Sequence, residues 1–246
     1  MFLWSKKMSF VIGVAGCSGS GKTTVSTLIA EHYEGRCVVI SADNYYLGKE
    51  QMKVDSFDNP EAIDFDLLVQ HIQLLKMGKN INMPHYDFTT SSRKPETTTV
   101  PPCDIIIIEG ILVFHPEKLR QLMDESIFVD TDIDVCRDRR IERDVKERGR
   151  EKEHALAQWN RDVLPSYKEF VEPSKEHAKT TIENTELSPE HNFDISPVLE
   201  YLDTIQNGKK MASEGRKRFS MFPKTQETNT INPDKQITTP INEFSY

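Results

Sequence analysis

Four short apolar runs and the helical patterns between them organise this chain. The runs lie at residues 10–15, 36–43, 104–110 and 126–130 and are rich in valine and isoleucine. β-Branched residues without polar alternation are typical of strands buried on both faces of a parallel sheet. Residues 105–108 are four consecutive isoleucines, as expected for a central strand. The pattern therefore predicts an α/β fold around a central parallel sheet.

Apolar residues at helical spacing predict the helices that alternate with these strands. Val25, Leu28 and Ile29 follow the first run, and a second apolar stripe runs from Phe65 to Leu75, with Asp64 as its N-cap. Further patterns predict helices over residues 116–123 and 134–150, around Pro165, and over 195–205, with a strand at 178–183. The order of strands and helices fits a three-layer fold.

Residues 81–100 predict an inserted β-hairpin. Its arms are residues 81–88 and 97–100, and the polar segment 89–95 is the expected turn. Tyr86 and Phe88 are two residues apart and therefore share a face. On that face they either stack on a base or pack the hairpin onto the main domain, and the sequence leaves both possibilities open.

The last 40 residues differ in composition from the rest. We predict one domain over residues 8–206 and a polar, mostly disordered tail over 207–246, where apolar residues are few. The formal net charge of −8 argues against general nucleic-acid binding, and no apolar run approaches the length of a membrane span. The four cysteines are far apart and in no metal-ligand spacing, which predicts reduced thiols in a cytoplasmic protein.

The strongest motif follows the first apolar run. It comprises Gly16, Cys17, Ser18, Gly19, Ser20, Gly21, Lys22 and Thr23. Glycines let backbone N–H groups converge on phosphate oxygens, and the helix that follows points its positive end at the same anion. Lys22 is expected to reach the terminal phosphates and Thr23 to hold Mg²⁺, with Thr24 completing the ATP contacts. A simple connecting turn is the alternative, but the complete motif between strand and helix favours nucleoside triphosphate binding.

Two acids follow predicted strands, at the edge where parallel sheets place their sites. Asp43 ends the second run and is a candidate catalytic base for an acceptor hydroxyl; the alternative is an ordinary turn aspartate. Glu109 ends the isoleucine strand and is a candidate Mg²⁺ carboxylate; the alternative is a solvated strand-end acid. The upstream phosphate motif favours function for both.

The predicted helix over 134–150 is dense in charge. Arg139, Arg143 and Lys146 fall on one helical face. One interpretation is a solvated helix whose acids pair with its bases. The other is an Arg-rich lid that neutralises the transferred phosphoryl group, which the phosphate motif favours.

These features narrow the class of enzyme. The chain lacks the Asn-Lys-x-Asp motif by which GTPases normally read guanine, and it is short for a motor or ABC-type ATPase. A phosphate loop, an acid after the second strand and an Arg-rich lid suit a small kinase. Such a kinase needs its acceptor in line with the γ-phosphate and water excluded by closure.

The chain resembles the uridine–cytidine kinase family over about residues 10–183. The matching segments are Gly16–Thr23, Ser41–Tyr46, Phe57–Pro60, Pro84–Phe88, Ser92–Thr97, Ile108–Leu112, Phe128–Asp132, Arg139–Arg140 and Glu147–Arg150. The resemblance implies a P-loop kinase that phosphorylates the 5′-hydroxyl of uridine and/or cytidine with ATP and Mg²⁺, in pyrimidine salvage. It also implies a homo-oligomer, often a tetramer.

The same resemblance assigns roles to individual residues. Asp43 matches the catalytic base, and Asp58 and Arg140 match residues that hold the ribose hydroxyls. Tyr86, Arg150 and Gln158 match residues that contact the base. Glu109 matches a magnesium-site acid, and Arg143 and Arg148 match lid residues near the phosphates. The substrate-binding set is completed by Tyr46, Phe88 and Ser91.

One position departs from the family pattern. Aligned on Arg93, Ser91 stands where the family has a histidine that reads the 4-position of the pyrimidine. Serine is shorter and reaches that position through water, or the base preference differs. His85 lies nearby but on the opposite face of the strand from Tyr86. Two alternatives stay open: a kinase of a related nucleoside such as nicotinamide riboside, and a non-catalytic nucleotide-binding regulator.

Overall fold

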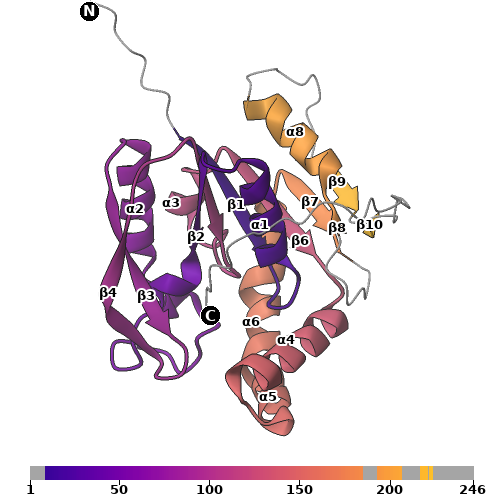
Figure 1. Cartoon of the computed structure of the whole chain (residues 1–246). Coiled ribbons are helices and arrows are strands. Elements are labelled where there is room, and N and C mark those ends of the chain that lie inside the picture. Colours follow the sequence, from indigo (N-terminus) through magenta and orange to yellow (C-terminus); the bar gives the residue numbers. More distant parts are fainter. Residues whose placement is uncertain (1–8, 185–192, 207–216, 221, 224–246) are drawn as a thin grey trace, which may run out of the picture.

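A six-stranded parallel sheet forms the centre of the computed structural model, which describes residues 9–184, 193–206, 217–220 and 222–223 (Figure 1). The strands are β1 Phe10–Gly16, β2 Cys37–Ser41, β5 Ile105–Glu109, β6 Glu125–Asp130, β7 Thr180–Glu183 and β9 Lys217–Ser220. Their order across the sheet is β2-β5-β1-β6-β7-β9, and each neighbouring pair is parallel. The predicted α/β fold is confirmed.

The isoleucine strand β5 shows why the sheet has a helical layer on each face. Ile105 and Ile107 belong to one buried cluster with residues of α1 (Lys22–His32) and α8 (Ser196–Gln206). Ile106 and Ile108 belong to the other, with residues of α2 (Phe65–Lys76) and α3 (Glu117–Arg120). Burying each such side chain contributes about 1.5–3 kcal/mol. A strand that is apolar on both faces therefore requires cover on both.

The hairpin is present, with a shorter turn than predicted. It consists of β3 (Ile81–Asp87) and β4 (Ser92–Val100), so residues 92–95, expected in the turn, belong to a strand. Arg93 ties the hairpin to the chain after β2: its guanidinium donates to the Tyr45 carbonyl at 2.7 Å and to the Tyr46 carbonyl at 2.9 Å. The hairpin is thereby fixed beside the sheet edge that carries the site.

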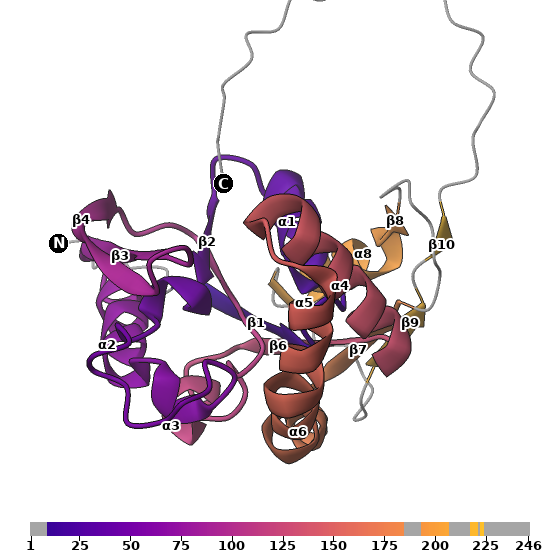
Figure 2. The same cartoon turned by 90° about the horizontal axis from the view of Figure 1, so that it is seen from below.

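A long helical segment lies across the sheet from the hairpin (Figure 2). It begins with α4 (Ile133–Arg148) and continues as α5 (Lys152–Gln158), α6 (Leu164–Ser166) and α7 (Glu172–Ser174). Two π turns, Trp159–Val163 and Tyr167–Val171, precede Pro165 and Pro173. Each proline lacks the N–H that an α-helix would use there, so the wider turns keep the segment helical.

Short 3₁₀ turns connect several elements and bring candidate residues to the sheet edge. They are Ala42–Tyr45, Pro60–Ala62 and Lys175–His177. In the ladder, Ser41 at the end of β2 is paired with Glu109 at the end of β5. The carboxyl ends of β1, β2 and β5 thus meet at one edge, as the sequence predicts.

The segment expected to be a disordered tail contributes to the sheet. β9 lies within it and pairs with β7, Thr180 opposite Lys217, so the expectation of disorder is wrong for residues 217–220. Residues 222–223 form β10 (Phe222–Pro223), which pairs with β8 (Phe193–Asp194). The polar composition hides β9 because an edge strand needs little apolar surface. The remainder of the expected tail lies outside the described residues.

No helix within the described part of the chain combines the length and the apolar character needed to cross a membrane.

Candidate active site

Two glycines with positive φ shape the loop between β1 and α1. Gly19 has φ 86° and Gly21 φ 95°. A Cβ at Gly19 would lie 2.4 Å from the carbonyl oxygen of Cys136 in α4, so only glycine permits this approach. Gly21 is the N-cap of α1, and no side chain caps the helix there. The first N–H groups of α1 are thus available to an anion.

One carbonyl of this loop is held by two buried side chains that the sequence analysis did not identify. The Ser20 carbonyl accepts hydrogen bonds from the Thr131 hydroxyl at 2.9 Å and from the Asn184 amide at 2.7 Å. Thr131 directly follows β6 and Asn184 directly follows β7. The strand-end rule that selected Asp43 and Glu109 would have found both.

Lys22, Thr23 and Glu109 lie together at the mouth of the loop. The buried Lys22 ammonium donates to the Cys17 carbonyl at 3.4 Å. Glu109 is also buried and accepts a hydrogen bond of 2.5 Å from the Ser41 hydroxyl. Burial raises the pKa of Glu109, and the positive charge of Lys22 opposes that rise. The structure thus brings these three residues together, with Ser41 beside them.

The donor atoms here fit Mg²⁺. A threonine hydroxyl and a carboxylate supply oxygen ligands, which Mg²⁺ prefers, and this ion usually keeps waters and substrate phosphates as its other ligands. The described residues hold no group of three or more His, Cys, Asp or Glu side chains that would form a complete protein cage. Such a two-residue donor set suits a metal that arrives with a nucleotide.

Asp43 lies in the 3₁₀ turn after β2 and lines the same cleft as Lys22 and Glu109. Its backbone N–H donates to the Ser41 hydroxyl at 3.3 Å, which caps the turn. Ser41 therefore contacts both the acid of β5 and the turn that carries Asp43. This single side chain links the candidate metal acid to the candidate base.

Four aromatic rings form one wall of the cleft. Tyr46 packs against Phe57 at 5.8 Å and against Tyr86 at 5.5 Å between ring centroids, and Tyr86 packs against Phe88 at 5.1 Å. The rings pack the hairpin onto the domain, which confirms one of the two possibilities left open by the sequence, and they also line the cleft. Stacking on a base stays a prediction. The Tyr86 hydroxyl is buried and has no hydrogen-bond partner among the described residues. Ser91, also in the cleft lining, has φ 52°.

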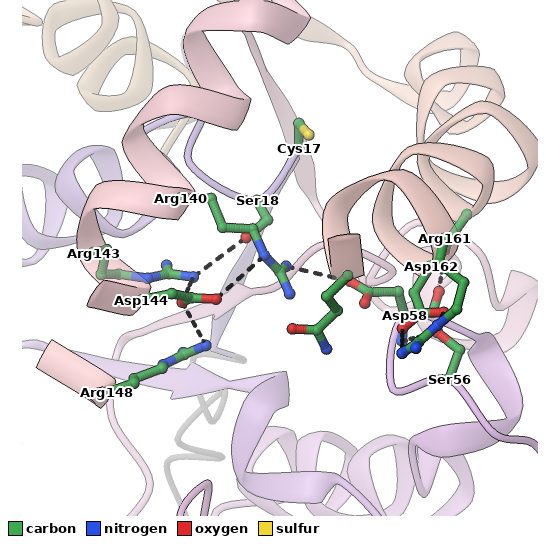
Figure 3. A network of polar contacts seen from close by, with 12 residues as sticks. Cys17, Ser18, Ser56, Asp58, Arg140, Arg143, Asp144, Arg148, Arg161 and Asp162 are labelled. Atoms are coloured by element: carbon green, nitrogen blue, oxygen red, sulfur yellow. Dashed lines mark hydrogen bonds and ion pairs between the residues drawn. The ribbon is translucent and has the colours of Figure 1, made fainter. Parts of the chain in front are cut away.

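Four arginines from α4 and the residues after it form the opposite wall. We call Arg140, Arg143, Arg148 and Arg150 the arginine cluster. Arg140 donates to Asp58 at 3.5 Å, and Arg143 donates to the Ser18 hydroxyl of the loop at 3.4 Å (Figure 3). Arg150 donates to Gln158, and the Arg148 guanidinium lies 4.8 Å from the centroid of the Phe88 ring. The arginine cluster therefore faces the cleft, as the lid interpretation requires, and its action on a transferred phosphoryl group stays a prediction.

The solvated face of α4 contains a residue that the sequence grouped with the lid. Lys146 is exposed and pairs with Glu142 at 2.5 Å, and unlike Arg143 it is not part of the cleft lining. Arg143 is partly buried: burial lowers the pKa of its guanidinium, the neighbouring Arg148 adds to this, and Asp144 opposes it. Arginine nevertheless remains protonated in proteins.

These walls border a cleft that is open to solvent at the carboxyl edge of the sheet. Its lining includes the predicted residues Ser18, Lys22, Thr23, Asp43, Tyr46, Asp58, Tyr86, Phe88, Ser91, Glu109, Arg140, Arg143, Arg148, Arg150 and Gln158. Phe57 and Ile111 also line it and were not predicted individually, although both lie in segments that match the family. Thr24 and the remaining loop residues Gly16, Cys17, Gly19, Ser20 and Gly21 are outside the lining. Those five form the backbone of the loop.

Sequence comparisons agree with this geometry. The family described as "Phosphoribulokinase / Uridine kinase family" matches residues 11–188. A relative named uridine kinase from Anoxybacillus flavithermus is 43% identical over 183 residues, which is 72% of this chain and 87% of the relative. A uridine kinase from Brevibacillus brevis is 44% identical over 178 residues, covering 70% and 83% of the two chains.

Solved structures share the fold at lower identity. A phosphoribulokinase from Rhodobacter spheroides aligns with TM-score 0.55 at 17% identity, covering 74% of this chain and 72% of its own. A possible uridine kinase from Bacillus stearothermophilus aligns with TM-score 0.53 at 17% identity, covering 73% and 91%. These likenesses support the P-loop kinase architecture.

Proposed function

Because this chain belongs to the phosphoribulokinase / uridine kinase family, we propose that it transfers the γ-phosphoryl group of ATP to the 5′-hydroxyl of uridine and/or cytidine. The observation that carries the proposal is the single cleft in which a phosphate loop faces Asp43 and an aromatic wall. The loop accounts for the triphosphate, the wall for a flat base, and Asp43 for the hydroxyl between them. The products are ADP and UMP or CMP.

The transfer needs three parts of the cleft at once. Asp43 accepts the proton of the 5′-hydroxyl while that oxygen forms a bond to the γ-phosphorus, and the bond from phosphorus to the bridging oxygen of ADP breaks. Lys22 and Arg143 stabilise the negative charge that spreads over the transferred group. When Mg²⁺ is bound it neutralises phosphate charge, and Thr23 and Glu109 are the residues that would hold it.

The nucleoside is held by the walls of the cleft. Asp58 and Arg140 form a buried pair whose remaining hydrogen-bonding capacity suits the two ribose hydroxyls. The rings of Tyr86 and Phe88 offer a face on which the base stacks. Arg150 and Gln158 reach the base edge from the opposite side, and the buried Tyr86 hydroxyl, which lacks a partner among the described residues, is a further donor to it.

One observation favours a second candidate within the same chemistry. Ser91 occupies the position where the family resemblance implies a histidine, so a related nucleoside such as nicotinamide riboside remains a candidate acceptor. The non-catalytic regulator has weaker support, because Lys22, Asp43 and Glu109 line one cleft together. Cytoplasmic location and assembly into a tetramer stay predictions from the sequence; light scattering after size-exclusion chromatography measures the second.

The direct test is ADP release from Mg-ATP with separate acceptors. The acceptors are uridine, cytidine, adenosine, nicotinamide riboside and none, with 5′-deoxyuridine as a matched control that lacks only the reacting hydroxyl. We expect turnover with uridine or cytidine and none with 5′-deoxyuridine. Turnover with another nucleoside alone would show that the chain is a kinase with a different acceptor. ATP binding without any acceptor-dependent turnover would contradict the proposal and favour the regulator.

A further inference from the structure

The centre of the arginine cluster is a single carboxylate that the transfer mechanism above does not use. Asp144 is 1% exposed, and each of its oxygens faces two guanidinium groups. One oxygen lies 3.0 Å from Arg148 and 3.6 Å from Arg143. The other lies 3.8 Å from Arg140, which Figure 3 also shows, and 3.2 Å from Arg150. A buried carboxylate needs such partners, and four neighbouring cations need a negative charge between them.

The chain brings these groups together by helical spacing and one turn. Arg140 and Arg148 lie four residues before and four after Asp144 on α4, so the three side chains share one helical face. Arg143 directly precedes Asp144, and its long side chain reaches the carboxylate from the neighbouring face at 3.6 Å. Gly149 ends the helix with φ 61°. The turn lets the Arg150 N–H bond to the Asp144 carbonyl at 3.1 Å while its guanidinium meets the carboxylate. Asp144 therefore holds Arg150 through both backbone and side chain.

The other acids of α4 have a different environment. Asp138 pairs with Arg137 at 2.9 Å and Glu142 pairs with Lys146, and all four side chains are mostly exposed or border solvent. Exposed pairs of this kind contribute little. Asp144 alone among these three acids is buried against the residues that line the cleft.

Each arginine that contacts Asp144 has a second contact on a different part of the cleft. Arg140 contacts Asp58 on the ribose side, and Arg143 contacts Ser18 of the phosphate loop. Arg150 contacts Gln158 and Arg148 lies over Phe88, both on the base side. One carboxylate thus connects the nucleoside side of the cleft with the phosphate side.

From this arrangement we propose that Asp144 is the positioning residue that sets the four guanidinium groups of the arginine cluster for binding both substrates. The inference rests on the proposed function, because it assumes that the arginine cluster binds the two substrates of phosphoryl transfer. Replacing the carboxylate by a neutral amide of the same shape removes the negative charge that the four cations share, while Arg140 keeps its second acid, Asp58. The guanidinium groups then separate, and the contacts to Asp58, Ser18 and Gln158 weaken together.

The test compares Asp144→Asn with Asp138→Asn, the matched change on the exposed face of the same helix. Circular dichroism at the assay temperature gives the folded fraction, so that kcat is expressed per folded molecule. We expect Asp144→Asn to lower kcat/KM for uridine by about 100-fold or more and to raise KM for both uridine and ATP. Asp138→Asn should stay within about twofold of the unmodified chain.

A purely structural role would lower the melting temperature of Asp144→Asn but leave kcat and both KM values of the folded fraction unchanged, and that result would overturn the proposal. If Asp144→Asn does not fold, Asp144→Glu is used to test the positioning role, because it keeps the negative charge and shifts it by the length of one methylene group. The proposal predicts about a tenfold loss of kcat/KM for folded Asp144→Glu. Values equal to those of the unmodified chain would contradict it.

Calorimetric binding separates this proposal from the proposed function. Uridine and ADP are titrated into the unmodified chain and into Asp144→Asn, without turnover. If the unmodified chain releases no ADP with any nucleoside, the kinase assignment fails. The titrations still test Asp144: weaker binding of both ligands to the variant supports the positioning role, and equal binding refutes it.

Discussion

The phosphate loop and the arginine cluster both face the cleft, but they prepare it for an anion in different ways. The loop uses backbone N–H groups that neighbouring residues bring together, and its shape depends on glycines at positive φ. The cluster uses four full charges that repel one another and a buried carboxylate that compensates them. The loop is therefore sensitive to added atoms and the cluster to changes in charge.

The two regions also touch. Gly19 of the loop lies against the backbone of α4 at Cys136, and Arg143 of the cluster donates to Ser18 of the loop. Because α4 carries both contacts, a shift of this helix moves the cations and the loop together. The following predictions act on one region at a time, from the largest expected effect to the smallest.

Adding a single Cβ to the loop should have the largest effect. Gly19→Ala places an atom 2.4 Å from a backbone oxygen of α4 and forces alanine to positive φ. We expect kcat/KM for ATP to fall by about 100-fold or more, because the loop must move away from its phosphate-binding geometry.

The matched control is Gly35→Ala. Gly35 has φ 72° but no atom within 4 Å of the added Cβ. The Gly35→Ala variant should lose about 1–2 kcal/mol of stability, and its kcat and KM values should equal those of the unmodified chain. Equal kinetics for Gly19→Ala and Gly35→Ala would show that the contact with α4 does not shape the loop.

A change of geometry at constant charge should affect the cluster less. Arg140→Lys keeps the cation but loses the guanidinium fork that faces both Asp58 and Asp144. We expect KM for uridine to rise about 10–100-fold, because the variant loses one or two charge-assisted hydrogen bonds. KM for ATP should change less. Arg137→Lys, on the exposed side of α4, should leave both constants unchanged, and a similar rise in that variant would contradict the assignment.

Ser91→His should change kcat/KM for the pyrimidine nucleosides by up to about tenfold. Ser91 has φ 52°, a conformation that histidine tolerates better than most residues, and it lines the cleft beside Tyr86. If the missing histidine limits recognition, kcat/KM for uridine and cytidine rises while that for other nucleosides does not. Thr90→His, one residue away and outside the cleft lining, is the control. A lower kcat/KM in Ser91→His would indicate that the wider pocket serves another base.

The smallest expected effect is a dependence of stability on pH at Asp58. Burial raises the pKa of this carboxyl, and Arg140 opposes the rise. A raised pKa in the folded state means that the folded chain takes up this proton first as pH falls. The unmodified chain should thus gain stability relative to Asp58→Asn between about pH 7 and pH 4. We expect the melting temperature of the unmodified chain to rise relative to that of Asp58→Asn as the pH falls over this range, and a change of opposite sign would show that Arg140 dominates.

The sequence was sufficient for the parts of the molecule that follow local rules. Three features depend only on residues that are neighbours in the chain, and all three are as predicted. They are the strand-loop-helix motif, Asp64 as the N-cap of α2, and the isoleucine strand β5. The strand-end rule also placed Asp43 and Glu109 in one cleft.

Long-range contacts were less predictable. Asp144 and Glu142 look alike in the sequence of α4, but one is buried among arginines and the other is exposed to solvent. The difference depends on packing against α5 and the loop, which no local pattern encodes. The same holds for β9, whose pairing with β7 joins residues 37 positions apart in the chain, such as Thr180 and Lys217.

The most direct test of the whole account is the Asp43→Asn variant, measured for uridine-dependent ADP release and, in parallel, for ADP affinity by calorimetry. The amide keeps the shape of the side chain but cannot accept the proton of the 5′-hydroxyl. The account predicts that turnover falls by about 10²–10⁴-fold while ADP affinity stays within about twofold of the unmodified chain. Unchanged turnover would remove Asp43 from the chemistry and contradict the central claim that this cleft activates a nucleoside hydroxyl.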